Sequence, residues 1–189
     1  MKIPRNAHEP SPLGISGEQI HELAKKIAQT TRFIPGDPCA GLIKKFGGQI
    51  AGLMSGDIVD TDADVMIVYD DGNFVARIKA PHAAGTPEMN FELAIILGYF
   101  TMFVNGVRKV HGGSASMVVP YYPKTKAQKA CYAEAVQFAA AFLAPEEQFL
   151  DRWCRYAGDV NAVSKALGIP PKIIPGMVSA YNAPTLKAG

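Results

Sequence analysis

The stretch NFELAIILGYFTMF, residues 90–103, is apolar almost from end to end and lies shortly after Pro87. A proline just before an apolar run is typical of the first turn of a helix. We therefore expect a buried helix that begins at Pro87 and ends at Gly106, since glycine commonly follows the last turn of a helix. The run is shorter than a membrane span and carries Asn90 and Glu92 near its start, which favours a core helix.

The composition indicates a globular protein of one domain, or of one domain with a small appendage. The chain has 189 residues, of which 48% are hydrophobic and 19% charged, enough for a core. Its net charge of +2 does not indicate a protein that coats nucleic acid or binds a membrane surface. Three separate cysteines, Cys39, Cys131 and Cys154, and an N-terminus without an apolar segment predict a soluble, cytoplasmic protein with reduced thiols.

The remaining patterns predict an α+β domain in which helices cover a small antiparallel sheet. Residues 1–16 hold three prolines and are interpreted as a flexible or draping arm. A DDGN turn between β-rich runs in residues 63–80 predicts a hairpin, and QIAGLM before it a further strand. Residues 108–127 are interpreted as an irregular loop. Helices are expected over residues 16–33, 38–47, 127–145 and 145–158, and the last helices over 159–182 resemble a helix-turn-helix.

Two motifs, in the same order, carry a resemblance to a known family. Residues 91–100, FELAIILGYF, resemble the zinc-binding motif FxLAHELGHY, and residues 134–145, EAVQFAAAFLAP, resemble EANxFAAxLLMP. Both motifs are similar to those of the ImmA/IrrE family of zinc-dependent endopeptidases. The resemblance extends from Ser16 to the C-terminal helices and implies a zincin-like domain over residues 17–148, with residues 149–189 as a C-terminal helical region. The shared apolar positions include Leu93, Leu97 and Gly98.

This sequence departs from the family motif at its chemical positions, which are those that bind zinc or act as the general base. In an HExxH helix, two histidines one turn apart bind Zn²⁺, the glutamate acts as general base, and a later residue completes the site. Here the ligand positions are Ile95 and Tyr99, the base position is Ile96, and only the third ligand remains, as Glu134. The resemblance therefore implies a degenerate site with no catalytic residue, metal or cofactor. We expect Tyr99 to donate a hydrogen bond to Glu134, with Glu92 as a further member of this polar cluster.

These observations predict a catalytically inactive, metallopeptidase-like regulatory protein, a pseudoenzyme that acts by binding another protein. The resemblance implies a repressor or toxin-like partner and an association with a phage or mobile element. Met117, Tyr121 and Tyr122 are the predicted contacts with the partner, since tyrosine and methionine are common at interfaces. The sequence leaves the oligomeric state open.

Two alternatives use other parts of the chain. The C-terminal helices would make the protein a DNA-binding regulator, although Pro175 would lie inside the second helix and only Lys165 and Lys172 are near. A rearranged metal site built from His82, His111 and Glu134 would make it an active metallopeptidase. Nucleic acid is the less favoured partner, and no membrane is expected.

Overall fold

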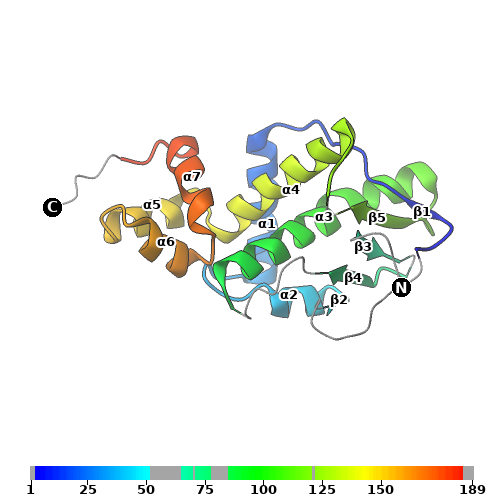
Figure 1. Cartoon of the computed structure of the whole chain (residues 1–189), viewed down its shortest axis with the longest axis horizontal. Coiled ribbons are helices and arrows are strands. Elements are labelled where there is room, and N and C mark those ends of the chain that lie inside the picture. Colours follow the sequence, from blue (N-terminus) through cyan, green and yellow to red (C-terminus); the bar gives the residue numbers. More distant parts are fainter. Residues whose placement is uncertain (1–2, 52–64, 70, 78–84, 121, 185–189) are drawn as a thin grey trace.

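The computed structural model describes residues 3–51, 65–69, 71–77, 85–120 and 122–184. Its helices are α1 (Gly17–Thr31), α2 (Ala40–Lys45), α3 (Pro87–His111), α4 (Lys126–Leu143), α5 (Glu146–Arg155), α6 (Val160–Leu167), the short 3-10 helix η1 (Pro171–Ile173) and α7 (Ile174–Ala180). Its strands are β1 (Ala7–His8), β2 (Gly48–Ala51), β3 (Val65–Val68), β4 (Phe74–Arg77) and β5 (Ser116–Pro120). The sheet lies at one end of the molecule and α5–α7 at the other, with α3 and α4 running between them (Figure 1). The predicted combination of helices and a small sheet is confirmed.

The sheet is mixed, in the order β1-β5-β3-β4-β2. The central strand β3 is antiparallel to both β4 and β5, whereas the outer pairs β1–β5 and β2–β4 are parallel. The expectation of an antiparallel sheet is therefore wrong for the two outer strands. A tight turn forces β3 and β4 to be antiparallel, but strands connected through longer segments are free to pair in parallel.

The hairpin predicted at the DDGN turn is confirmed. The Tyr69 amide donates to the Asn73 carbonyl at 2.8 Å, and the Asp71 carboxylate accepts from the Asn73 amide at 2.9 Å. Gly72 has a φ of 89°, which a residue without Cβ adopts at little cost. Two other strands were missed by the sequence analysis, because β5 lies inside the predicted irregular loop and β1 inside the predicted arm.

Helix α3 begins at Pro87 as predicted, and the Thr86 hydroxyl caps it by accepting from the Met89 amide. It does not end at Gly106 but continues to His111. A glycine inside a helix costs only about 1 kcal/mol, and the buried Val107 just beyond it more than offsets that cost. In the part of the chain that the structure describes, α3 is the one helix long and apolar enough to cross a membrane. Because 72% of its most apolar window is buried inside the protein, it has the character of a core helix of a soluble protein.

Helices α3 and α4 pack side by side through a glycine contact (Figure 1). A Cβ atom on Gly98 of α3 would lie 3.0 Å from Cδ1 of Phe138 and 3.2 Å from the carbonyl oxygen of Ala135, both on α4. The missing side chain therefore lets the two helix backbones approach closely. Helix α1 packs on α4, with Ile20 and Ala24 fully buried. The register between α3 and α4 positions the residues of the expected site.

Asn90 at the start of α3 joins three separate elements. Its Oδ1 accepts from the Cys39 amide before α2 at 2.7 Å, and its Nδ2 donates to the Gly168 carbonyl after α6 at 3.4 Å. Only 6% of Asn90 is exposed, so these bonds replace the water that its amide group would otherwise require. The side chain thus links the C-terminal helices to the domain that contains the sheet.

Two glycines of α3 offer opposite tests of this packing. We expect Gly106→Ala to raise the free energy of unfolding by about 0.5–1 kcal/mol, because Gly106 is exposed and alanine favours the helix. Gly98→Val should lower it by about 1–3 kcal/mol, because the added carbons would overlap Phe138 and Ala135. Urea unfolding of both variants measures the two changes. Equal effects would show that Gly98 does not set the distance between α3 and α4.

The Asn90 contacts predict a large effect from a small truncation. We expect Asn90→Ala to lower the free energy of unfolding by about 2–3 kcal/mol, because the buried amide of Cys39 and the carbonyl of Gly168 lose their partner. Asn105→Ala on the exposed side of the same helix is the matched control and should change stability by less than about 0.5 kcal/mol. Similar free energies of unfolding for both variants, measured in urea, would contradict the proposal that Asn90 links the three elements.

Candidate functional site

The three positions that would carry metal chemistry lie in the core. Ile95, Ile96 and Tyr99 on α3 are 9%, 3% and 5% exposed. Isoleucine offers no metal ligand and no proton acceptor, so these positions contribute burial of hydrocarbon instead. Burial, followed by the nearby Cys131 and Tyr132, raises the pKa of Tyr99 far above its ordinary value, so its hydroxyl stays neutral. The structure thus brings the predicted residues together as a packed region.

Glu134, the retained third ligand position, binds the N-terminal arm. Its Oε2 accepts from the Leu13 amide at 3.0 Å and its Oε1 from the Gly14 amide at 2.9 Å. The predicted hydrogen bond from Tyr99 is wrong: within the described residues the Tyr99 hydroxyl makes no hydrogen bond to Glu134. Two adjacent amides satisfy both carboxylate oxygens at once, whereas a single phenol would satisfy only one.

Glu92 and Glu134, the two acidic members of the predicted polar cluster, have different neighbours. Glu92, which is half-buried on α3, lies near Tyr132 of α4. Burial, and then the charge of Glu92, raises the pKa of Tyr132. Glu134 contacts the arm instead. These contacts place Glu92 beside Tyr132 and Glu134 beside the arm.

The arm runs along one face of α4 on its way from β1 to α1 (Figure 1). The Glu9 carboxylate accepts two bonds from Nε2 of Gln128, at 3.0 and 2.9 Å. The Pro10 carbonyl accepts from the Cys131 thiol at 3.6 Å. Gln128, Cys131 and Glu134 are spaced three residues apart on α4, which places them on one side of the helix. The arm therefore follows a defined path and covers Cys131, which is 1% exposed.

The alternative metal site is not assembled in the described part of the chain. His82 lies outside the described residues, and the His111 ring stacks on the His8 ring of β1 at 3.8 Å with an interplanar angle of 4°. His111 is also about 20 Å along α3 from Gly98, which faces α4 next to Glu134. Among the described residues, no three His, Cys, Asp or Glu side chains are grouped in a way that could hold a metal ion.

Only one of the three predicted contact residues is placed at the surface. Met117 is 1% exposed because it lies on the inward side of β5, so the prediction that it contacts a partner is wrong. The error follows from interpreting a strand as a loop. Tyr121 lies outside the described residues. Tyr122 is 57% exposed, as a contact residue requires.

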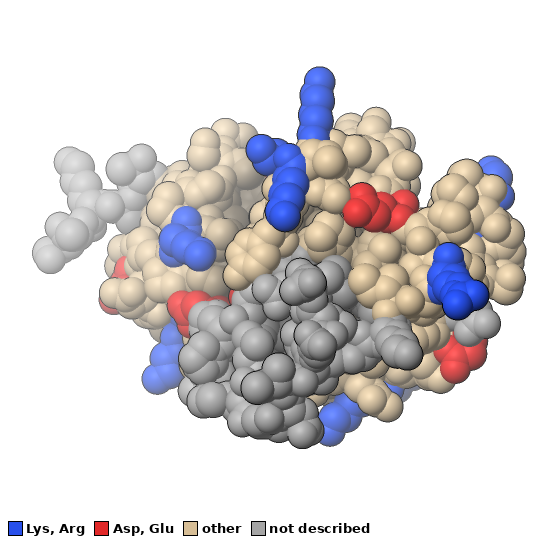
Figure 2. All heavy atoms as spheres, turned by 45° about the vertical axis from the view of Figure 1, so that its right-hand side comes forward, with Lys and Arg blue, Asp and Glu red and all other residues tan. Residues whose placement is uncertain are grey.

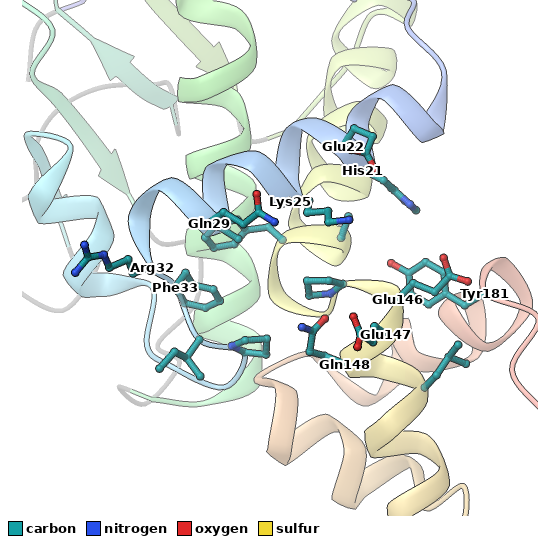
Figure 3. A pocket seen from close by; sticks show the side chains of 17 residues that line it. His21, Glu22, Lys25, Gln29, Arg32, Phe33, Glu146, Glu147, Gln148 and Tyr181 are labelled. Atoms are coloured by element: carbon teal, nitrogen blue, oxygen red, sulfur yellow. The ribbon is translucent and has the colours of Figure 1, made fainter.

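A groove of about 840 Å³ lies between α1 and the start of α5, and the sequence analysis did not predict it. Its floor is apolar and includes the stacked rings of Phe33 and Phe142. Lys25 and Gln29 lie on the α1 side, with Glu147 and Gln148 on the α5 side (Figure 3). The sequence does carry one sign of this groove, because the spacing of the lining residues of α1 places them along one flank of that helix. The lining is His21, Glu22, Lys25, Ala28, Gln29, Arg32, Phe33, Ile34, Pro35, Ala141, Phe142, Pro145, Glu146, Glu147, Gln148, Leu150 and Tyr181.

The C-terminal helices have little cationic surface for a phosphate backbone. Pro175 lies in the first turn of α7, so the expectation that it interrupts a helix interior is wrong, and it costs nothing there. Helix α7 contains no lysine or arginine, and Lys165 and Lys172 are exposed outside it. On the face shown in Figure 2, the described Lys and Arg side chains do not form a continuous patch.

Comparison with models of protein families, with curated proteins and with solved structures finds no match to this chain. Its function is therefore argued from the residues themselves.

In the part of the chain that the structure describes, the Tyr99 hydroxyl makes no hydrogen bond to Glu134, which leads to a test of this position. We expect Tyr99→Phe to change the free energy of unfolding by less than about 0.5 kcal/mol, because no bond to that carboxylate is lost. Tyr99→Ala should cost about 3–5 kcal/mol, since it empties a buried aromatic position. Thermal and urea unfolding measure both. A loss above about 1.5 kcal/mol for Tyr99→Phe would show that the hydroxyl has a partner after all.

Proposed function

We propose that this chain is a catalytically inactive, metallopeptidase-like regulatory protein of the cytoplasm that acts by binding another protein. Its zincin-like domain would derive from the ImmA/IrrE family, and its partner would be a repressor or toxin-like protein of a phage or mobile element. The observation that carries the proposal is the burial of Ile95, Ile96 and Tyr99 at the three chemical positions. The retained carboxylate, Glu134, is bonded to the protein's own arm.

The chemical argument against catalysis at this position is direct. Zinc hydrolysis needs three protein ligands, an open coordination position for water, and a base that accepts a proton from that water. Ile95 and Ile96 supply neither a lone pair nor a proton acceptor. The phenol of Tyr99 stays protonated because burial raises its pKa. One carboxylate is then left, and its two oxygens already accept hydrogen bonds.

Several surface features support a role in protein binding. The groove between α1 and α5 combines an apolar floor with a rim that carries both charges, which suits an amphipathic segment of a partner. Ile34 at its edge is 64% exposed, and Tyr122 on another part of the surface is 57% exposed. Ile34 thus adds exposed apolar surface to the edge of the groove, which a partner could bury.

The proposal is tested by capturing the partner and by measuring whether the captured partner is cleaved. We expect the tagged full-length chain to retain a partner from a lysate of its source cells, and the intact mass of that partner to stay unchanged during incubation of the purified complex. Shortening of the partner would show catalysis and contradict the proposal. The matched control is bait unfolded in urea, which should retain nothing.

Metal removal gives an independent test. We expect dialysis against a strong chelator to shift the melting temperature by less than about 1 °C, because metal that binds the native state would stabilise it by mass action. Elemental analysis of the purified chain should find less than one zinc per molecule. A stoichiometric metal whose removal lowers the melting temperature would favour the rearranged metallopeptidase site instead.

A further inference from the structure

The face of α4 beneath the arm has a segment bound to it, whereas the groove between α1 and α5 is known only by its lining. The lining of the groove suits an amphipathic segment, but it does not specify the backbone conformation of that segment. The α4 face, defined by Gln128, Cys131 and Glu134, is occupied by residues 9–14 of the chain itself. The seated arm therefore shows which kind of segment this face accepts.

The contacts of this face are made mainly to backbone atoms. Glu134 accepts from two consecutive amides, Leu13 and Gly14, and the thiol of Cys131 donates to the carbonyl of Pro10. Pro10 is buried against the face. Gly14 has a φ of 64°, a left-handed conformation that a residue without Cβ adopts at little cost, and its amide and the preceding one donate to the same carboxylate. The seated segment thus carries a buried proline and, four residues later, a glycine with a positive φ.

The arm is held loosely enough to leave. Of residues 3–14, only Pro10 is buried, so release exposes little apolar surface. The strand β1 at its start comprises only Ala7 and His8 and pairs with β5 along one side. Segments with few buried contacts and exposed hydrogen bonds open locally at small cost.

We infer that this α4 face is a docking site for an extended segment of a protein partner that carries the proline–glycine spacing of the arm. The incoming segment displaces residues 9–14 and makes the same contacts with Glu134 and Cys131. The inference rests on the proposed function in protein binding, and it names the surface and the kind of segment. The arm in place is then the closed state, and the arm released is the binding-competent state.

A labelled peptide with the sequence of residues 6–16 is the probe. The receptor is the full-length chain with Gly14→Pro, since proline cannot adopt a φ of 64° and lacks the amide that donates to Glu134. We expect this variant to bind the peptide at least about tenfold more tightly than the wild-type chain, whose tethered arm competes at a millimolar effective concentration. Equal binding by the two chains would overturn the inference. A peptide that itself carries Gly14→Pro should not bind.

A second substitution locates the peptide on the protein. Adding Glu134→Ala to the Gly14→Pro chain should weaken binding at least about tenfold, because both amides of the peptide lose a charged acceptor. The matched control is Glu147→Ala, which removes a glutamate from the groove between α1 and α5. It should leave peptide binding unchanged. If Glu147→Ala weakens binding and Glu134→Ala does not, the peptide occupies the groove and the inference is wrong.

The three cysteines report arm release in the wild-type chain, so the test does not depend on a variant that folds. Cys154 is exposed, Cys131 lies under the arm, and Cys39 is buried in the core. Burial, and then the charge of Glu134, raises the pKa of Cys131 to about 11. We expect a thiol reagent to modify Cys154 first, Cys131 next and Cys39 last. Simultaneous modification of Cys131 and Cys39 would mean that the arm leaves only on unfolding, and would overturn the inference.

Saturating peptide adds a second readout in the Gly14→Pro chain. There Cys131 should react at least about tenfold faster than in the wild type, and bound peptide should restore the slow rate. If instead the wild-type chain forms a dimer whose copies exchange their arms, the occupant is a second copy and the proposed partner segment is wrong. The peptide assay tests whether the α4 face binds the peptide, and the capture from a lysate tests whether the protein binds a partner without cleaving it. A negative result in one assay therefore leaves the other proposal standing.

Discussion

The close approach of α3 and α4 at Gly98 is the constraint on which the other features depend. With no side chain at this position, Ala135 and Phe138 of α4 lie against the α3 backbone. A single added Cβ atom would force a neighbour to give by a few tenths of an ångström, and a larger side chain would disturb the packing of the two helices further. The same contact fixes which residues of α4 point away from α3. Glu134, next to Ala135 in sequence, is thereby held at the edge of the helix pair, within reach of the arm.

This geometry connects α3 and α4 through side-chain packing. A bound metal ion would hold α3 and α4 together through ligands from both helices. Here the stacked and buried side chains make that connection, and each large apolar side chain contributes about 1.5–3 kcal/mol by leaving water. Phe138 and Phe142 on α4 are fully buried. Hydrocarbon packing thus connects the two helices in the region of Ile95, Ile96 and Tyr99.

The sequence predicted features that depend on local patterns. The start of α3 at Pro87, the start of α1 beside Ser16 and the turn at Gly72 follow from nearest neighbours in the chain, and the structure confirms them. The residues of the candidate site lie on α3 and α4, but the contacts of Glu134 were not predicted. The partners of Glu134 are more than a hundred residues away in sequence, at Leu13 and Gly14. Their hydrogen bonds leave no periodic signal, because they involve backbone amides that every residue except proline possesses.

The two missed strands have the same physical origin. β1 has only two residues, and its pairing with β5 is fixed by contacts such as that between the Asn6 side chain and the Ser114 carbonyl. A strand of two residues is too short to show an alternation of apolar and polar side chains. Its pairing with β5 is what makes it a strand. The end of α3 was missed because the buried Val107 outweighs the helix-breaking tendency of Gly106. In each case a distant contact decided the local structure.

The Glu134 carboxylate accepts hydrogen bonds from backbone amides, and these bonds link the fold to recognition. Backbone amides are the donors that any extended segment can offer, so a site built on Glu134 distinguishes segments by backbone conformation and not by side-chain chemistry. A proline fixes one φ angle and a glycine permits a positive one, so the spacing of these two residues determines which segments fit. Glu134 is thereby suited to bind peptide backbone.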